Sequence, residues 1–340
     1  MDLNQMKAVA RAMVANGKGL LAADESSPTI KKRFDTIDTE STEENRRRYR
    51  EMLFTTPGIA ESIGGVILFD ETIRQKTSDG VPFATYLDGL GIIPGIKVDK
   101  GAKDLAGFPG EKVTEGLDGL RDRMTEYYGM GARFAKWRAV INIGKDIPSD
   151  FCLHANAHAL ARYAALCQEA NIVPIVEPEV IMDGGHSIER CEEVTAAALD
   201  KVFAELAAHR VALEGIVLKP NMVISGTEAS DRAGPEQVAE ATLRCLKAHV
   251  PAEVPGIAFL SGGQTAEEAT GHLSIMNAMD SDLPWELSFS YGRALQAPAL
   301  DAWRGREENF KAGQEALARR ARLNRLAHLG EYSSDMEAAA

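Results

Sequence analysis

Lys219 stands at the end of an otherwise apolar run, Gly215-Ile-Val-Leu218, and has the clearest chemical potential of any residue in this chain. A primary amine that has lost its proton is a nucleophile, and it forms imines with ketones. An amine in water keeps its proton up to a pH of about 10, so burial or a second cation must favour the neutral form. A lysine at the end of a strand can also simply reach solvent. Its neighbours in the fold must decide between these interpretations.

Eight short apolar runs, each bounded by glycine, proline or polar residues, are predicted to be β-strands. They cover residues 19–23, 65–69, 93–98, 132–137, 172–176, 215–218, 256–260 and 285–290. Segments rich in Ala, Leu, Glu and Arg between them are predicted to be helices, such as residues 43–54, 150–169, 187–209, 236–249 and 266–279. Strands that alternate with helices form a parallel sheet, and eight such units match a (β/α)8 TIM barrel of the α/β class.

An open doubly wound sheet is the alternative architecture, and it usually carries GxGxxG after its first strand. Here the first predicted strand runs into Ala23-Asp-Glu-Ser26, and no GxxxxGK[ST] phosphate loop occurs. We therefore predict a single domain over residues 1–340. The barrel is expected to cover residues 17–293 after a short extra N-terminal segment, and residues 294–340 to form C-terminal helices and a mobile tail.

The composition excludes several classes of protein. A net charge of −12 argues against general binding to nucleic acid or to an anionic membrane. No run of about 18 uncharged apolar residues and no signal-peptide pattern is found, so we expect a soluble, cytoplasmic protein. Four cysteines, Cys152, Cys167, Cys191 and Cys245, form no CxxC pair, so neither a zinc site nor a disulfide framework is indicated.

Polar residues occur at the ends of most predicted strands, where barrel enzymes place their chemistry. In chain order they are Asp24, Lys97, Lys136, Arg138, Glu177, Glu179, Lys219, Ser261, Ser290 and Arg293. A charged side chain inside a barrel is costly unless it is paired or lies in a wet, functional mouth. So many at equivalent positions indicate one shared site.

The spacing of four of these residues predicts how they face. Residues two apart on a strand point the same way, so Lys136 and Arg138 share one face, and Glu177 and Glu179 share a face of the next strand. A purely structural ion-pair cluster is one interpretation. In the functional one, charge repulsion from Lys136 favours a neutral Lys219, Glu177 transfers protons, and Glu179 orients the two lysines.

Two anion sites are also predicted. Leu260-Ser-Gly-Gly-Gln264 and Ser290-Tyr-Gly-Arg293 follow the last two strands, where barrels usually bind phosphate, and they offer backbone N–H groups and a guanidinium. The second site combines the basic run Thr29-Ile-Lys-Lys-Arg33 with Lys97. Anion sites on both sides of an amine imply a small substrate that is phosphorylated at both ends.

Through these segments the chain resembles the class I fructose-bisphosphate aldolases, the metal-independent, imine-forming family. The matching motifs are LAADES at 21–26, GIKVDKG at 95–101, AKWR at 135–138, PIVEPE at 174–179, LKPNM at 218–222, FLSGGQ at 259–264 and SYGRA at 290–294. They are long, specific and in the family's order, and they cover roughly residues 17–300.

The resemblance implies a TIM barrel that reversibly cleaves fructose 1,6-bisphosphate to dihydroxyacetone phosphate and glyceraldehyde 3-phosphate. No metal or other cofactor is expected, and the family suggests a homo-oligomer, a tetramer. Lys219 is then the imine-forming lysine, and Glu177 assists loss of water from the carbinolamine. Asp24 contacts the hydroxyl whose deprotonation breaks the carbon–carbon bond, and Lys136 supplies positive charge nearby.

The resemblance assigns further roles around these four residues. Glu179 supports Lys136 and Lys219, and Arg138 belongs to the same polar cluster. The phosphate next to the ketone is assigned to Ser261, Gly262, Ser290, Gly292 and Arg293, and the distal phosphate to Ser26, Thr29, Arg33 and Lys97. The chain departs from animal members of the family in two places. It has Ser27-Pro28-Thr29 where they carry Thr-Gly-Ser, and its sequence does not end in tyrosine.

Three alternatives remain at this point. A metal-dependent aldolase would need convergent histidines, and His154 and His158 have the best spacing for them, although no HExxH pattern accompanies the pair. Another imine-forming barrel enzyme, acting on a monophosphate or deoxysugar, would not need the second basic site. An inactive phosphate-binding scaffold would not need Lys219, Glu177 and Asp24.

Overall fold

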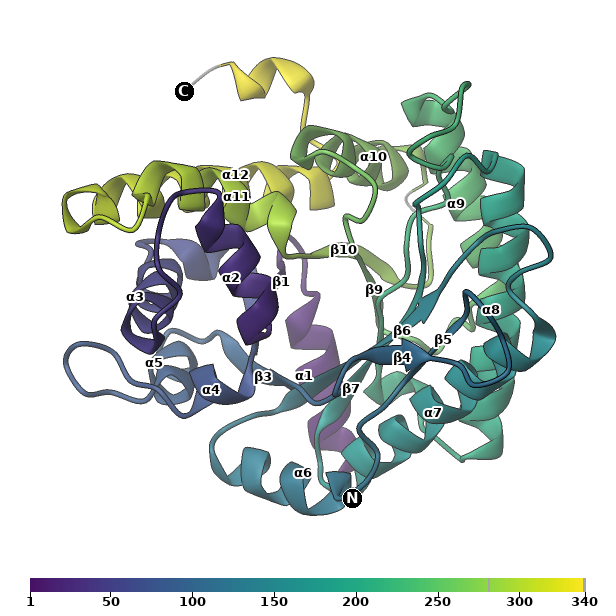
Figure 1. The fold of residues 1–340 in the computed structure, drawn as a ribbon, viewed down its shortest axis with the longest axis horizontal. Helices are drawn as coiled ribbons and strands as arrows, with labels where there is room; N and C mark the ends of the chain where they lie inside the picture. Colours follow the sequence, from purple (N-terminus) through teal and green to yellow (C-terminus); the bar gives the residue numbers. More distant parts are fainter. Residues whose placement is uncertain (281, 339–340) are drawn as a thin grey trace.

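The predicted barrel is present in the computed structural model, which describes residues 1–280 and 282–338. Its eight parallel strands close in the order β1-β10-β9-β8-β7-β6-β3-β2, and Figure 1 shows helices arranged around them. The strands are β1 (Gly19–Ala23), β2 (Ile63–Leu68), β3 (Ile93–Lys97), β6 (Phe134–Ile141), β7 (Val173–Val180), β8 (Val217–Leu218), β9 (Gly256–Phe259) and β10 (Glu286–Tyr291).

Helices connect and cover the strands. The α-helices are α1 (Leu3–Met13), α2 (Ser27–Asp35), α3 (Glu43–Phe54), α4 (Asp70–Ile73), α5 (Phe83–Gly89), α6 (Leu120–Gly129), α7 (Asp150–Glu169), α8 (Ile188–Ala208), α9 (Pro235–His249), α10 (Ala266–Met279), α11 (Arg293–Trp303) and α12 (Phe310–His328). Short 3-10 turns are η1 (Ile59–Glu61), η2 (Leu213–Gly215), η3 (Glu307–Asn309) and η4 (Ser334–Glu337). Capping residues mark several starts, because Thr42, Ser149 and Thr265 accept N–H groups of the first turns of α3, α7 and α10.

Two barrel strands are longer than the sequence predicts. β6 continues through Arg138 to Ile141, and β7 continues through Glu177 and Glu179 to Val180. The apolar runs end earlier, but the hydrogen-bonded ladder between β6 and β7 continues through residues with charged side chains. These side chains form ion pairs in the barrel mouth. A small antiparallel hairpin of β4 (Ala102–Asp104) and β5 (Lys112–Thr114) was not predicted, because these two short strands carry no apolar run.

The barrel interior has an apolar lower half. A cluster of buried residues joins Leu20, Ile67, Phe134 and other strand residues to Met6 and Met13 of α1. The amino end of β2 packs closely against the end of α1. A side chain at Gly64 would collide with the Met13 carbonyl oxygen at 2.8 Å. The extra N-terminal segment is therefore a helix that packs against the amino ends of the strands.

The C-terminal helices share the core that surrounds the barrel. Trp303 of α11 stacks on Tyr49 of α3 with ring centroids 5.4 Å apart, and both rings contact Phe34 of α2. This aromatic cluster fixes α2 at the mouth of the barrel. The end of the predicted mobile tail, residues 339–340, lies outside the described residues, and η4 just before it is bonded to α12 through Glu337. In the part of the chain that the structure describes, no helix is both long and apolar enough to span a bilayer.

Candidate active site

A cavity of about 590 Å³ opens at the carboxyl ends of the barrel strands. Its lining includes every residue to which the family resemblance gave a catalytic or phosphate-binding role. These are Asp24, Ser26, Thr29, Arg33, Lys97, Lys136, Arg138, Glu177, Glu179, Lys219, Ser261, Gly262, Ser290, Gly292 and Arg293. Closure of the barrel thus brings residues from most of the strands, from α2 and from the loops into one place.

Lys219 is held inside this mouth by both its backbone and its side chain. Its N–H donates to the Val176 carbonyl oxygen at 2.8 Å, and Pro220, which has no N–H, follows it at the end of the ladder. The side chain is only 5% exposed, and its Nζ lies 3.1 Å from Glu177 Oε1. The amine is therefore not a strand-end lysine in solvent, and it lies within proton-transfer distance of a carboxylate.

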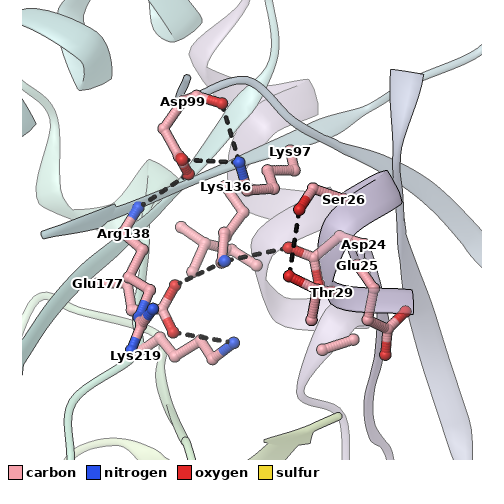
Figure 2. A network of polar contacts seen from close by, with 12 residues as sticks. Asp24, Glu25, Ser26, Thr29, Lys97, Asp99, Lys136, Arg138, Glu177 and Lys219 are labelled. Atoms are coloured by element: carbon pink, nitrogen blue, oxygen red, sulfur yellow. Dashed lines mark hydrogen bonds and ion pairs between the residues drawn. The ribbon is translucent and has the colours of Figure 1, made fainter. Parts of the chain in front are cut away.

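Glu177 is shared between two lysines, as Figure 2 shows. Its Oε1 faces Lys219, and its Oε2 lies 3.1 Å from Lys136 Nζ. Burial on its own raises the pKa of this carboxyl group, but the positive charges of Lys136, Lys219 and Arg138 outweigh burial and lower the pKa below its usual value. The three cations therefore favour the ionised carboxylate, which is the form that can accept a proton.

Asp24 completes a chain of alternating charges. Asp24 directly follows β1, and its Oδ2 accepts a hydrogen bond from Lys136 Nζ at 3.0 Å. Burial opposes ionisation of Asp24 most strongly, yet the charges of Lys136 and Lys219 lower its pKa. Burial on its own lowers the pKa of Lys136, but Asp24 and Glu177 raise it above its usual value, which favours the ammonium form between the two carboxylates.

Glu179 does not occupy the place predicted for it. From its sequence position Glu179 is expected to orient Lys136 and Lys219, whereas its carboxylate is paired with Arg138 Nε. Contact with both lysines is made by Glu177 instead. Glu179 and Arg138 each lie two residues further along their strands than Glu177 and Lys136, toward the rim of the mouth. Burial on its own lowers the pKa of Arg138, but the negative charge of Glu179 raises this pKa above its usual value.

The loop after β9 is built for close approach of a ligand. Gly263 has a left-handed backbone with φ of +73°, which a residue with a side chain rarely adopts. A side chain at Gly262 would lie 3.0 Å from Leu260 and 3.2 Å from Glu179 Oε1. Backbone N–H groups can therefore face the cavity here without obstruction.

The end of β10 supplies the other half of this predicted phosphate site. Ser290 is 1% exposed, and its Oγ has no hydrogen-bond partner among the residues that the structure describes. Gly292 is the N-cap of α11, and Arg293 is its first residue, so the positive end of a helix dipole and a guanidinium lie together. A buried, unsatisfied hydroxyl beside these groups favours a ligand with acceptor oxygens.

Three of the four residues assigned to the distal phosphate, Ser26, Thr29 and Lys97, lie on one side of the cavity. Ser26 is the N-cap of α2, and its Oγ lies 3.1 Å from the Thr29 Oγ1. Lys97 lies on β3, and its ammonium donates to Asp99 Oδ1 at 2.7 Å. These three side chains lie near one another in Figure 2, with the amino end of a helix beside a cation, which is a recognised anion-binding arrangement.

Arg33 lies closer to the first phosphate site than the sequence suggests. Its guanidinium is paired with Glu25, and a side chain added at Gly292 would be 3.7 Å from Arg33 Nη2. Arg33 therefore borders the loop after β10 as well as the α2 face of the cavity. Its neighbours Lys31 and Lys32 are exposed on α2 and lie outside the cavity lining.

Glu25 and Asp99 are site residues that the sequence analysis missed. Glu25 is buried, and it pairs with Arg33 and with Arg50 at 2.6 Å, so it anchors the Arg33 guanidinium. Asp99 lies two residues after Lys97, and this spacing could have revealed it. As a result, the lining carries six carboxylates alongside six cations and is not simply basic. Selection of an anion must therefore depend on where the cations lie.

The histidines considered for metal-dependent chemistry are elsewhere. His154 and His158 are on α7, and neither lines the cavity. Their side chains face Glu205 of α8 rather than Lys219. This pair cannot polarise a ketone that is bound beside Lys219.

Comparison with known proteins gives one consistent family. The family model described as glycolytic fructose-bisphosphate aldolase class-I matches residues 5–340. A protein of Xanthomonas campestris pv. campestris named probable fructose-bisphosphate aldolase class 1 is 61% identical over 98% of this chain and 99% of its own length. Fructose-bisphosphate aldolase 6, cytosolic, of Arabidopsis thaliana is 54% identical over 94% of this chain and 89% of its own.

A solved structure is also close to this one. It is a ternary co-crystal structure of fructose-bisphosphate aldolase from Plasmodium falciparum in complex with TRAP and a small-molecule inhibitor. The two chains share 49% sequence identity and a TM-score of 0.96, over 98% of this chain and 96% of that one.

Replacing Lys136 with Met should destabilise the protein, and the loss should depend on pH. At pH 7 two buried carboxylates lose their shared cation, at a cost of about 3–5 kcal/mol. In the wild type the lowered pKa values of Asp24 and Glu177 add stability above about pH 4, and this stability is lost as the pH falls through them. In the variant burial raises both pKa values, so acid relieves the strain, and the deficit should be smaller at pH 4 than at pH 7.

Urea unfolding of both proteins at the two pH values measures this difference. Lys7→Met, which removes an exposed partner of Glu214, is the control and should cost no more than about 1 kcal/mol. An equal deficit for Lys136→Met at both pH values would show that the three charges are not coupled.

Proposed function

Because the chain belongs to the class-I fructose-bisphosphate aldolase family, we propose that Lys219, Glu177, Lys136 and Asp24 are its catalytic residues. The reaction is the reversible cleavage of fructose 1,6-bisphosphate to dihydroxyacetone phosphate and glyceraldehyde 3-phosphate through a lysine imine, and class I is the metal-independent type. The observation that supports these roles best is the 3.1 Å contact of a buried Lys219 Nζ with the Glu177 carboxylate inside the cavity.

Imine formation uses this contact twice. Glu177 takes one proton from the Lys219 ammonium, and the neutral amine attacks the ketone carbon to give a carbinolamine. Glu177 then returns the proton to the hydroxyl group, which leaves as water, and the nitrogen retains the positive charge of an iminium ion. Lys136 on the other oxygen of Glu177 holds the carboxylate in place for both transfers.

Cleavage of the carbon–carbon bond uses the other end of the charge chain. Asp24 takes the proton from the hydroxyl on the far side of the bond that breaks, and the aldehyde product forms there. The bonding electrons move to the iminium and are stored as an enamine, so no free carbanion is formed. Lys136, 3.0 Å from Asp24, stabilises the negative charge that develops on the hydroxyl oxygen. Protonation of the enamine and hydrolysis of the imine release the second product.

In this proposal, other residues of the cavity lining bind the two phosphates. The phosphate beside the ketone is bound by Ser261, Gly262, Ser290, Gly292 and Arg293. The distal phosphate is bound by Ser26, Thr29 and Lys97, and Arg33 lies between the two groups and contributes to both. Arg138 and Glu179 form an ion pair at the rim that keeps the mouth in shape.

We also propose the assembly and location that the family suggests. The chain is expected to form a homo-oligomer, a tetramer by family resemblance, and to act on a small phosphorylated sugar without nucleic acid or membrane partners. A cytoplasmic location follows from plant relatives whose names describe them as cytosolic or cytoplasmic.

Borohydride reduction in the presence of dihydroxyacetone phosphate should fix the substrate covalently on Lys219. Mass analysis of the modified peptide identifies the lysine. Lys219→Ala should show no trapping and lose at least about 10⁴-fold in kcat, because no amine remains to form the imine. Glu177→Gln should lower kcat by about 10²–10⁴-fold, since proton transfer is lost while the amine is kept. Trapping on Lys136 in the wild type would refute these roles.

Lys97→Met should reduce activity on fructose 1,6-bisphosphate much more than on fructose 1-phosphate. One charge-assisted hydrogen bond to the distal phosphate contributes about 1.5–3 kcal/mol, so the ratio of the two kcat/KM values should fall by about 10–150-fold. Lys100→Met is the matched control, because Lys100 is exposed in the same segment and lies outside the cavity lining. Equal losses on both substrates would remove Lys97 from the distal site.

A further inference from the structure

Three histidines and one glutamate meet between α7 and α8, on the outside of the barrel. His154 and His158 are one turn apart on α7, and Glu205 and His209 are one turn apart at the end of α8. Residues four apart on a helix present side chains on the same face, and here the two pairs face each other across two packed helices. From this arrangement we propose a binding site for a divalent transition-metal ion of the zinc type.

The distances fit such an ion. One ligand atom from each of His158, Glu205 and His209 lies within 4.8 Å of the other two. His158 Nδ1 lies 3.0 Å from Glu205 Oε2, and the His209 ring approaches the same oxygen, with its Nδ1 at 3.5 Å and its Nε2 left to bind an ion. Two ligands bound tetrahedrally at about 2.0–2.1 Å from zinc lie about 3.3 Å apart. These three residues are thus close enough together to share one ion after small side-chain movements.

A fourth donor is close by. His154 Nδ1 lies 3.4 Å from the other oxygen of the carboxylate, Glu205 Oε1. His209 Nδ1 is also 2.9 Å from the backbone oxygen of Glu205, and such a bond orients an imidazole and leaves its second nitrogen free. Two imidazoles and one carboxylate, with the His154 imidazole beside them, are a donor set that suits zinc, whereas calcium and magnesium prefer oxygen ligands.

The site is open to an ion from solvent. The side chains of His154 and His158 are 52% and 47% exposed, and His158 and His209 line a surface hollow of about 680 Å³. Other charges around this hollow are Arg121, Asp122, Arg162 and Glu169, and Arg121 is paired with Glu169.

The metal would have a structural role. None of the four ligands lines the catalytic cavity, so the ion supplies nothing to imine chemistry. It would instead link two neighbouring barrel helices and stabilise the folded state by mass action.

Calorimetric titration of the metal-free, full-length protein with Zn²⁺ tests the site. We expect saturable binding of one ion per chain and a higher Tm. His158→Gln and His209→Gln should each weaken binding by at least about tenfold, because changes to second-shell residues alone cost about 10–100-fold. His249→Gln is the matched control: this histidine also faces a carboxylate of α8, Asp200 at 2.7 Å, but none of the residues that the structure describes adds a second imidazole there. Its affinity for Zn²⁺ should match that of the wild type.

Spectra of the Co²⁺-loaded protein identify the ligands. We expect the visible bands of tetrahedral cobalt without a thiolate charge-transfer band. Unchanged affinity in both variants, a thiolate band, or no saturable binding would overturn the proposal. Aldolase activity should be the same with and without Zn²⁺.

Discussion

The structure depends on one buried carboxylate that is held between two lysines. Glu177 is 2% exposed and contacts Lys219 through one oxygen and Lys136 through the other, each at 3.1 Å. Removing Glu177 leaves the buried Lys219 without its partner, which is far more costly than the loss of a surface ion pair. The same arrangement gives Lys219 a neighbour that can accept and return its proton. Stability and chemistry thus depend on the same few contacts.

The barrel can contain these charges because its interior changes character along its axis. Side chains two apart on a strand share a face, so β6 presents Phe134 low in the barrel and Lys136 above it, while β7 presents Ile175 below Glu177. Packing in the lower layer is tight: a side chain at Gly95 would lie 2.2 Å from the Phe134 ring. A dense apolar floor with α1 beneath it therefore supports a polar mouth whose charges are paired with one another.

Alternation of strands with helices was sufficient to predict the barrel, and the polar strand ends identified most of the charged residues at its mouth, although Glu25 and Asp99 were missed. Side-chain alternation placed Lys136 and Glu177 beside each other on adjacent strands, but it did not predict the partner of Glu179. Whether Glu179 reaches a lysine or Arg138 depends on the register between β6 and β7. In the structure Arg138 is paired with Glu177, and the sequence of neither strand determines this register alone. Glu25 was missed for a similar reason, because its partner Arg50 comes from α3, which only tertiary packing brings to the mouth.

The ionisation state of Glu177 can be measured directly by infrared difference spectroscopy of the free protein against Glu177→Gln at pH 7. Charges on Lys136 and Lys219 lower the pKa of this carboxyl group, so the substitution should remove carboxylate bands and leave the carbonyl region of protonated acids unchanged. Loss of a protonated-acid band instead would mean that Glu177 is neutral in the free protein. The free protein would then have no carboxylate ion shared between Lys136 and Lys219, which contradicts the proposed basis of both its stability and its chemistry.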